Sequence, residues 1–333
     1  MRTGWIAVLA GLVLGAGAPA AIAARAQDWA IALHGEAGVI ERGSMTPEAE
    51  AAARLALSQA LKVGEDVLAA GGTAVEAVEA SIRVMEEHPQ FNAGHGAVFT
   101  SAGTIELDAA FMDGRTLASG AVTGVTTTRS PISLARTLMT AGPHVFLSGE
   151  AADRYASANG LEQVPNSFFM TERRKKQLDD LKLQGQGASL SPEMRFGTVG
   201  AVARDKAGNL AAATSTGGLT GKAPGRIGDA PVIGAGTIAD NRACAVSGTG
   251  SGEIFIRTRI AGQICDRARF GGQPLQAAAD AAIAELGALN GSGGVIVLGP
   301  RGEGLFSMNS AGKYRARASA AGVRSIAIYA DER

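Results

Sequence analysis

The sequence predicts an α/β protein, of the α+β kind, in which two stacked β-sheets are covered by helices on both outer faces. Strand-like segments occur in two runs with helical segments before and between them, an order that suits two packed sheets flanked by helices. Hydrophobic residues make up 46% of the 333 residues, which is ample for a packed core, and the 46 glycines suit a fold with many tight turns. The net charge of zero argues against the basic surface of a nucleic-acid-binding protein, so no nucleic-acid partner is expected.

Residues 1–26 have the pattern of an export signal. Arg2 gives a positive start, residues 6–18 are apolar, and small residues precede Ala26, after which we expect cleavage. The apolar run is short for a membrane span, and an uncleaved anchor is the alternative. The mature protein is therefore expected to be exported, periplasmic or secreted, with no membrane association after the signal is removed.

The first half of the chain contains clear helix and strand signals. Residues 29–33 form an apolar strand that ends at the loop 34–38. Thr46 caps a helix that begins with Pro47 and runs to about residue 70, and Thr73 and Glu76 form the capping box of a second helix to about residue 87. The next elements, in order, are a hairpin over 99–112 that turns at 101–103, a strand over 118–128, and helices over 131–140 and 150–159.

The second half begins with a change of composition. Residues 171–194 are charged at first, then rich in Gly, Gln and Ser, and lack aromatic residues, which is typical of a mobile linker. The expected elements beyond it are a hairpin over 199–213, helices over 252–269 and 275–289, and strands over 294–298, 304–308 and 324–329. Cys244 lies in an apolar strand and Cys265 in a helix, so two buried, reduced thiols are expected.

Gly197 and Thr198 stand at the start of the hairpin over 199–213. A Thr hydroxyl is a poor nucleophile unless a base lies within hydrogen-bond reach. If the chain were cut between these two residues, the new α-amino group of Thr198, with a typical pKa of roughly 7.7 to 8.0, would be that base. Gly197 suits such a cut because a residue without Cβ tolerates a strained backbone. A Gly-Thr pair alone is better explained as a hairpin start with a surface threonine.

Seven short motifs surround Thr198 along the chain. In order they read FNAG at 91–94, ELDA at 106–109, MDG at 112–114, GTVGAVA at 197–203, STGG at 215–218, PGRIGD at 224–229 and SGTGSGE at 247–253. Their order and spacing resemble those of the plant-type asparaginases, also called isoaspartyl peptidases, within the N-terminal nucleophile hydrolases. The resemblance covers nearly all of the chain after residue 29, and it implies a four-layer αββα sandwich.

The resemblance implies catalytic roles for five residues. Thr198 is the autocleavage site and nucleophile, and the Thr216 hydroxyl steadies its amino group. The Thr249 hydroxyl and the Gly250 N–H form the oxyanion hole, and Asn92 supports the nucleophile.

The resemblance also implies a site for the zwitterionic end of an amino acid. Arg226 would hold the substrate α-carboxylate, for which a planar fork with two parallel donors is suited. Asp229 would take the α-ammonium group, and Gly252 lies beside Thr249 and Gly250 in the same substrate-binding loop.

A structural sodium ion is a further implication of the resemblance, and the chemistry itself requires no cofactor. Its ligands would be backbone carbonyls of Met85, Glu86, His88, Phe91, Ala93 and His95. The scattered histidines show no metal-site spacing, so a transition-metal centre is not expected.

Two segments depart from the family pattern. The loop 34–38 reads HGEAG where the family has HGGAG, so Glu36 would be strained if that position needs a positive φ, which would affect the rate of maturation. Residues 309–315 read NSAGKYR in place of NTEGMYR, which weakens the case for substrate contacts there.

These features together predict an exported, self-processing threonine amidohydrolase with one catalytic domain. Residues 27–197 would form the α subunit and residues 198–333 the β subunit, and two such αβ pairs would assemble as a dimer. Its substrates would be isoaspartyl (β-aspartyl) dipeptides and L-asparagine, from which an acyl-enzyme on Thr198 would release L-aspartate.

Three alternatives remain at this point. A glycosylasparaginase is the nearest, although those relatives usually carry Asp before the Thr. A non-catalytic periplasmic amino-acid binder is the second. A dinucleotide-binding domain fits poorly because residues 248–252 lack the GxGxxG spacing.

Overall fold

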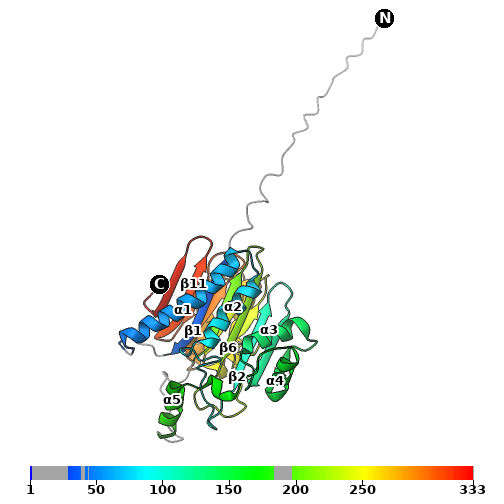
Figure 1. Ribbon diagram of the computed structural model, residues 1–333. Coiled ribbons are helices and arrows are strands. Elements are labelled where there is room, and N and C mark those ends of the chain that lie inside the picture. Colours follow the sequence, from blue (N-terminus) through cyan, green and yellow to red (C-terminus); the bar gives the residue numbers. More distant parts are fainter. Residues whose placement is uncertain (2–28, 39–41, 44, 184–196, 333) are drawn as a thin grey trace.

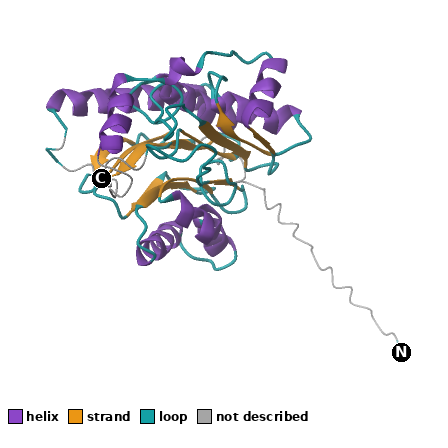
Figure 2. Ribbon diagram, turned by 90° about the horizontal axis from the view of Figure 1, so that it is seen from below, coloured by secondary structure: helices purple, strands orange, loops and turns teal. Residues whose placement is uncertain are grey.

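The computed structural model describes residues 1, 29–38, 42, 43, 45–183 and 197–332. The predicted signal, up to residue 26, and the second part of the predicted linker, 184–194, therefore lie outside the described residues except for Met1. Two β-sheets stack face to face, and helices cover both outer faces, which gives the layer order helix, sheet, sheet, helix (Figure 2). The predicted αββα sandwich is confirmed.

The larger sheet has eight strands in the order β12-β11-β1-β5-β6-β2-β3-β4. The first strand lies beside a strand from near the C-terminus, because β1 pairs with both β11 and β5 (Figure 1). Their bounds are β1 (Ala30–Gly38), β2 (Leu107–Asp113), β3 (Ser119–Val125), β4 (Phe146–Ser148), β5 (Val199–Arg204), β6 (Leu210–Thr216), β11 (Gly312–Ser319) and β12 (Arg324–Tyr329).

The smaller sheet has the order β10-β9-β8-β7. Its strands are β7 (Thr237–Ala239), β8 (Ala245–Gly250), β9 (Gly293–Leu298) and β10 (Leu305–Met308). Its outer helices are α6 (Gly252–Thr258), α7 (Ile260–Arg269) and α8 (Leu275–Ala288).

The larger sheet is covered by helices from the first half of the chain, with α1, α2 and α3 lying across it in Figure 1. The helices of this half are α1 (Pro47–Ala69), α2 (Ala74–Glu87), α3 (Pro131–Ala141), α4 (Gly149–Ala158), the 3₁₀-helix η1 (Asn166–Phe169) and α5 (Glu172–Leu183). The predicted caps are present, because Thr46 accepts from Ala49 N and Thr73 forms a capping box with Glu76.

Three apolar clusters fill the spaces between the layers. One lies under α1 to α3, one lies under α6 to α8, and one lies between the sheets. The cluster between the sheets is rich in small residues, including Ala30, Ala32 and Ala212, so the two sheets can approach closely.

Four expectations from the sequence are wrong in part. The turn at 101–103 forms, but Thr100 bridges to Lys222 instead of pairing with β2. The first part of the predicted linker is helix α5, which bears Lys-to-Asp pairs four residues apart. The predicted helix 252–269 is divided at Arg259, whose φ of 54° is left-handed and separates α6 from α7. The predicted loop 34–38 continues β1, and its Glu36 pairs with Tyr314 after a bulge, in an extended conformation rather than in a turn.

The prediction of two reduced thiols is also wrong, because Cys244 and Cys265 form a disulfide. Cys244 directly precedes β8 and Cys265 lies in α7, which packs on β8 in the same apolar cluster. This packing brings their Cα atoms to 5.4 Å, although 21 residues separate them in the sequence.

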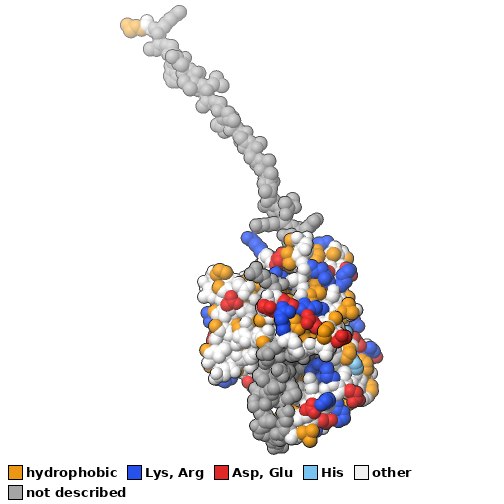
Figure 3. All heavy atoms as spheres, turned by 90° about the vertical axis from the view of Figure 1, so that its left-hand side faces the viewer, with side chains coloured by type: hydrophobic (Ala, Val, Ile, Leu, Met, Phe, Trp, Pro, Cys, Tyr) orange, Lys and Arg blue, Asp and Glu red, His pale blue; other side chains and the backbone are white. Residues whose placement is uncertain are grey.

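On the face drawn in Figure 3, basic and acidic side chains are interspersed, so neither charge predominates among the described residues there. Within the described residues, no helix has both the length and the apolar character needed to cross a membrane.

Candidate active site

Thr198 lies directly before β5, between the two sheets. Side chains alternate along a strand, and a Cβ added at Gly200 would meet Ser247 and His34, so this face of β5 points toward the smaller sheet. Thr198 is on the same face and is only 9% exposed. The neighbouring strand β6 ends at Thr216, which places the two threonines side by side.

The carbonyl oxygen of Gly197 is held by two side-chain donors in the uncut chain. Asn92 Nδ2 donates to it at 2.6 Å, and Thr216 Oγ1 donates to it at 2.9 Å. Asn92 is itself fixed, because its second Nδ2 hydrogen goes to Gly218 O and its Oδ1 accepts from Val98 N. Two preset donors on one carbonyl oxygen are the arrangement that stabilises negative charge during attack on its carbon.

Thr216 connects this carbonyl to the predicted nucleophile. Its Oγ1 accepts from Thr198 Oγ1 at 3.1 Å and from Gly218 N at 2.9 Å. Its single hydrogen is donated to Gly197 O, so the hydroxyl makes all three hydrogen bonds that it can form, one as donor and two as acceptor. The structure thus brings together Gly197, Thr198, Thr216 and Asn92.

A chain of buried hydrogen bonds fixes the other side of Thr198. His34 Nδ1 donates to Thr198 O at 2.9 Å, and its Nε2 accepts from Ser247 Oγ at 2.8 Å. Ser247 accepts in turn from Thr214, and Thr214 accepts from Thr237 at 2.5 Å. Burial, with a smaller effect of the nearby Lys313, holds the pKa of His34 well below its usual value, so the ring is neutral and one tautomer suits both bonds.

The sequence did not single out these polar residues as part of the site. The motif HGEAG contains His34, SGTGSGE begins with Ser247, and Thr214 directly precedes STGG. Their cooperation depends on how β1, β6 and β8 face one another, which sequence spacing does not reveal.

Thr249 and Gly250 end β8, and the Thr249 side chain faces the larger sheet, since it lies two residues after Ser247. The Thr249 hydroxyl is completely buried and has no hydrogen-bond partner. Gly250 has a φ of 151°, and a Cβ there would lie 2.3 Å from Ser292 O, so only glycine fits. A buried donor without a partner is unusual and is available for a ligand oxygen.

Arg226, Asp229 and Gly252 lie together. A Cβ added to Gly252 would lie 2.8 Å from Asp229 Oδ1 and 3.0 Å from Arg226 Nη2. A Cβ at Gly228 would lie 2.8 Å from Arg226 Nη1. The two glycines therefore let the backbone approach the guanidinium and the carboxylate closely, where a larger residue would clash.

Glu253 is a further charged group at this position. Arg226 Nε and Nη2 both lie against its Oε1, at 2.9 and 2.8 Å. This contact uses one edge of the guanidinium, whereas Nη1 points toward Gly218 and Gly228. Glu253 stands in the motif SGTGSGE, but the spacing of the motifs does not indicate that it reaches Arg226.

Asp229 is a buried carboxyl group with one unpaired oxygen. Burial raises its pKa to about 7, and the nearby Arg226 opposes this rise. Its Oδ2 has no hydrogen-bond partner. An ammonium group would supply the missing partner and favour the charged form.

The predicted sodium loop is a tight turn after α2. The backbone N–H of His95 donates to Glu86 O at 2.7 Å, and a Cβ at Gly94 would lie 2.4 Å from the same oxygen. The carbonyl oxygens of Met85 and His88 each accept one backbone hydrogen bond. Each of these oxygens keeps a second lone pair, the group that a carbonyl-bound sodium ion would use. Among the described residues, no cluster of His, Cys, Asp and Glu side chains is placed to hold a metal ion.

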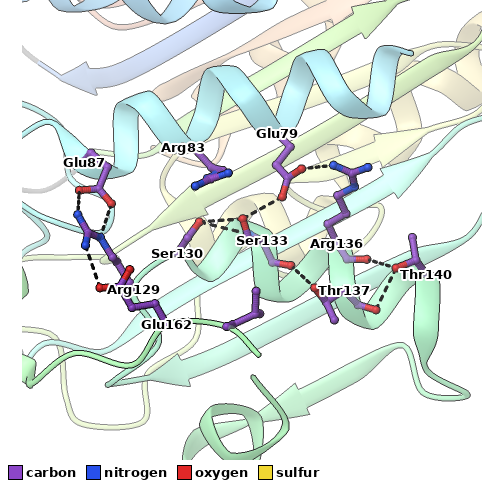
Figure 4. Close-up of a pocket in the computed structure, with 11 residues that line it drawn as sticks. Glu79, Arg83, Glu87, Arg129, Ser130, Ser133, Arg136, Thr137, Thr140 and Glu162 are labelled. Carbon is purple, nitrogen blue, oxygen red and sulfur yellow. Dashed lines mark hydrogen bonds and ion pairs between the residues drawn. The ribbon is translucent and has the colours of Figure 1, made fainter. Parts of the chain in front are cut away.

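A pocket of about 630 Å³ lies elsewhere, between α2, α3 and the segment around Glu162 (Figure 4). Five of its six charged side chains pair with one another, Arg129 with Glu87 and Glu162, and Arg136 with Glu79. None of its lining residues is a predicted site residue, so we do not assign the chemistry to it.

Known proteins resemble this chain over most of its length. A family model described as asparaginase matches residues 27–328. The chain is 46% identical to an isoaspartyl peptidase of Salmonella typhimurium over 306 residues, which are 90% of this chain and 98% of that protein. It is 45% identical to an isoaspartyl peptidase of Escherichia coli over 309 residues, 91% of this chain and 96% of that protein. It is also 42% identical to an isoaspartyl peptidase/L-asparaginase of Bos taurus over 251 residues, 75% of this chain and 81% of that protein.

Proposed function

The chain belongs to the asparaginase family, and we propose that it is a self-processing threonine hydrolase that releases L-aspartate from isoaspartyl dipeptides and L-asparagine. One observation carries the proposal. The carbonyl before Thr198 is held by Asn92 and Thr216, and Thr216 also receives the Thr198 hydroxyl.

Self-cleavage would begin with attack of Thr198 Oγ1 on the carbonyl carbon of Gly197. Asn92 and Thr216 would stabilise the oxyanion, and collapse would break the C–N bond and leave an ester between Gly197 and the Thr198 side chain, with a free α-amino group. Water would then hydrolyse the ester, which gives a carboxylate on Gly197 and restores the Thr198 hydroxyl. The α subunit would end at Gly197 and the β subunit would begin with Thr198.

The substrate reaction would use the new α-amino group as the base. It would accept the hydroxyl proton of Thr198 as the oxygen attacks the side-chain carbonyl of the substrate. The Thr249 hydroxyl and the Gly250 N–H would hold the oxyanion, while Arg226 and Asp229 hold the α-carboxylate and α-ammonium groups. Departure of ammonia or of the amino-acid leaving group gives an acyl-enzyme, and water releases aspartate.

The rivals differ in substrate and in processing. A glycosylasparaginase would hydrolyse asparagine-linked glucosamine, and a non-catalytic amino-acid binder would keep a single uncut chain. We propose to assay purified protein with β-Asp-Leu, L-asparagine and asparagine-linked glucosamine, and to run it on a denaturing gel. The proposal predicts two bands and aspartate release from the first two substrates. One uncut band, or activity on the glucosamine compound alone, would overturn it.

Three further features belong to this proposal. Export to the periplasm or out of the cell is supported by the leader sequence and by the disulfide, because disulfides persist mainly in oxidising compartments. A sodium ion in the loop 85–95 would have a structural role only and would fix the segment that carries Asn92. The resemblance supports a dimer of cleaved αβ pairs.

A further inference from the structure

Asp108 and Lys222 form a charged pair inside the protein, next to the candidate active site. Their side chains are 1% and 0% exposed, and Lys222 Nζ lies 3.7 Å from Asp108 Oδ2. Removing two charges from water is unfavourable, so such a pair needs a compensating arrangement around it. Neither residue has a role in the chemistry proposed above.

Asp108 stands beside Thr216. The two residues are opposite each other in the β2–β6 pairing, so their side chains lie on the same face of the sheet. Asp108 Oδ1 accepts from Gly124 N at 3.0 Å, where a bulge interrupts the β2–β3 register. Asp108 Oδ2 has no hydrogen-bond partner, so the ammonium of Lys222 is the group that faces it.

Lys222 anchors the middle of the segment 217–229, which carries Gly218 at one end and Arg226 and Asp229 at the other. Lys222 Nζ donates to Glu106 O at 2.9 Å, and its own carbonyl accepts from Ser101 N at 2.8 Å. The rest of the segment is a loop whose course depends on such fixed points, because three of its glycines have a positive φ.

Gly218 brings Lys222 close to Arg226. A Cβ at Gly218 would lie 3.2 Å from Lys222 Nζ and 3.4 Å from Arg226 Nη1, so both cations lie beside this glycine. Asp108 is the buried carboxylate beside them, and burial raises its pKa while Lys222 and Arg226 oppose the rise. Without Lys222, the Asp108 carboxylate would attract the guanidinium of Arg226. Without Asp108, Lys222 and Arg226 would repel each other with no carboxylate between them to reduce the repulsion.

We propose that the buried pair Asp108–Lys222 positions Arg226, and thereby sets the affinity for the substrate α-carboxylate rather than the rate of the chemical step. The inference rests on the proposed function. It makes Asp108 and Lys222 positioning residues, since neither touches the reacting atoms.

The test uses the full chain as wild type, Asp108→Asn, Lys222→Met and the double variant, each assayed with β-Asp-Leu after cleavage. Lys206→Met is the matched control, because the half-buried Lys206 also donates to a backbone carbonyl, Ala69 O, but lies away from the site. We expect each single change at the pair to raise KM at least 10-fold and change kcat less than 3-fold. The double variant should have a lower KM than Lys222→Met, because no unpaired buried carboxylate remains.

The melting temperature of each variant separates positioning from general stability. The inference would be overturned if KM were unchanged in both single variants. It would also be overturned if kcat fell together with the melting temperature while KM stayed unchanged. If the wild type itself neither cleaves nor hydrolyses β-Asp-Leu, the proposed function fails instead, so the two failures are distinguishable.

Discussion

Replacing Thr216 by Val tests the hydrogen bonds that prepare self-cleavage. Valine keeps the size and β-branching of threonine but removes the hydroxyl. That hydroxyl donates to Gly197 O at 2.9 Å and accepts from Thr198 Oγ1 at 3.1 Å and from Gly218 N at 2.9 Å. The variant therefore loses one of the two side-chain donors on the scissile carbonyl and the acceptor of the nucleophile.

The expected decrease in the cleavage rate follows from the number of hydrogen-bond donors on the Gly197 carbonyl oxygen. Removal of one oxyanion donor typically slows acyl transfer by about 10²- to 10³-fold, or about 2.7–4 kcal/mol. Asn92 remains as the second donor at 2.6 Å, so cleavage should be slowed within this range rather than abolished. Stability should fall less, by about 1–3 kcal/mol, because the buried Gly218 N–H is left without its partner.

The assay is a time course of the uncut chain on a denaturing gel after rapid purification. Thr128→Val is the control, since Thr128 is also a buried threonine but its hydroxyl donates to Asp153 Oδ1 instead of Gly197 O. Equal cleavage rates in Thr216→Val and wild type, or an equally large effect in Thr128→Val, would refute the reasoning.

Three other predictions concern buried charge and the disulfide. Burial raises the pKa of Asp229 to about 7, so the carboxylate that binds the substrate ammonium group forms as the pH rises through this value. Steady-state kinetics should therefore show KM falling between pH 6 and pH 8. The variant Asp229→Asn should lose this pH dependence. Burial holds the pKa of Lys313 well below its ordinary value near 10.5, so the unfolded chain binds more protons and stability should rise with pH up to that value. Urea titrations should accordingly find Lys313→Met more stable than wild type by about 1–3 kcal/mol at pH 7. This difference in the free energy of unfolding should become smaller toward pH 10. A difference that stays constant with pH would contradict a lowered pKa of Lys313. Replacing both Cys244 and Cys265 by Ser opens a loop of 21 residues and should lower the free energy of unfolding by about 3 kcal/mol, with a lower melting temperature that reductant reproduces in wild type only.

Local signals predicted the elements whose ends are fixed by neighbouring residues. Thr46 and Pro47 begin α1, and Thr73 with Glu76 begins α2, because caps act within one turn of helix. The elements that were missed depend on distant partners. Thr100 pairs with Lys222 across the fold, and β11, which was not expected, is held by β1 and β12.

In the candidate site, too, some residues could be predicted from the sequence and others could not. The resemblance in motif order and spacing indicated Thr198, Thr216 and Asn92, and the structure places these three side chains around the carbonyl oxygen of Gly197 and the Thr198 hydroxyl. The disulfide and the pair Asp108–Lys222 depend on which faces of separate elements meet. Such contacts leave no periodic signal in the sequence, and a buried Lys or Cys looks the same there whether or not it is paired.

The chain break itself is the most direct test of the account. Intact-mass spectrometry and N-terminal sequencing of the wild type should find two chains, with Thr198 as the first residue of the second, while Thr198→Ala should remain whole and inactive. An active wild type whose peptide bond between Gly197 and Thr198 is intact would contradict the central claim.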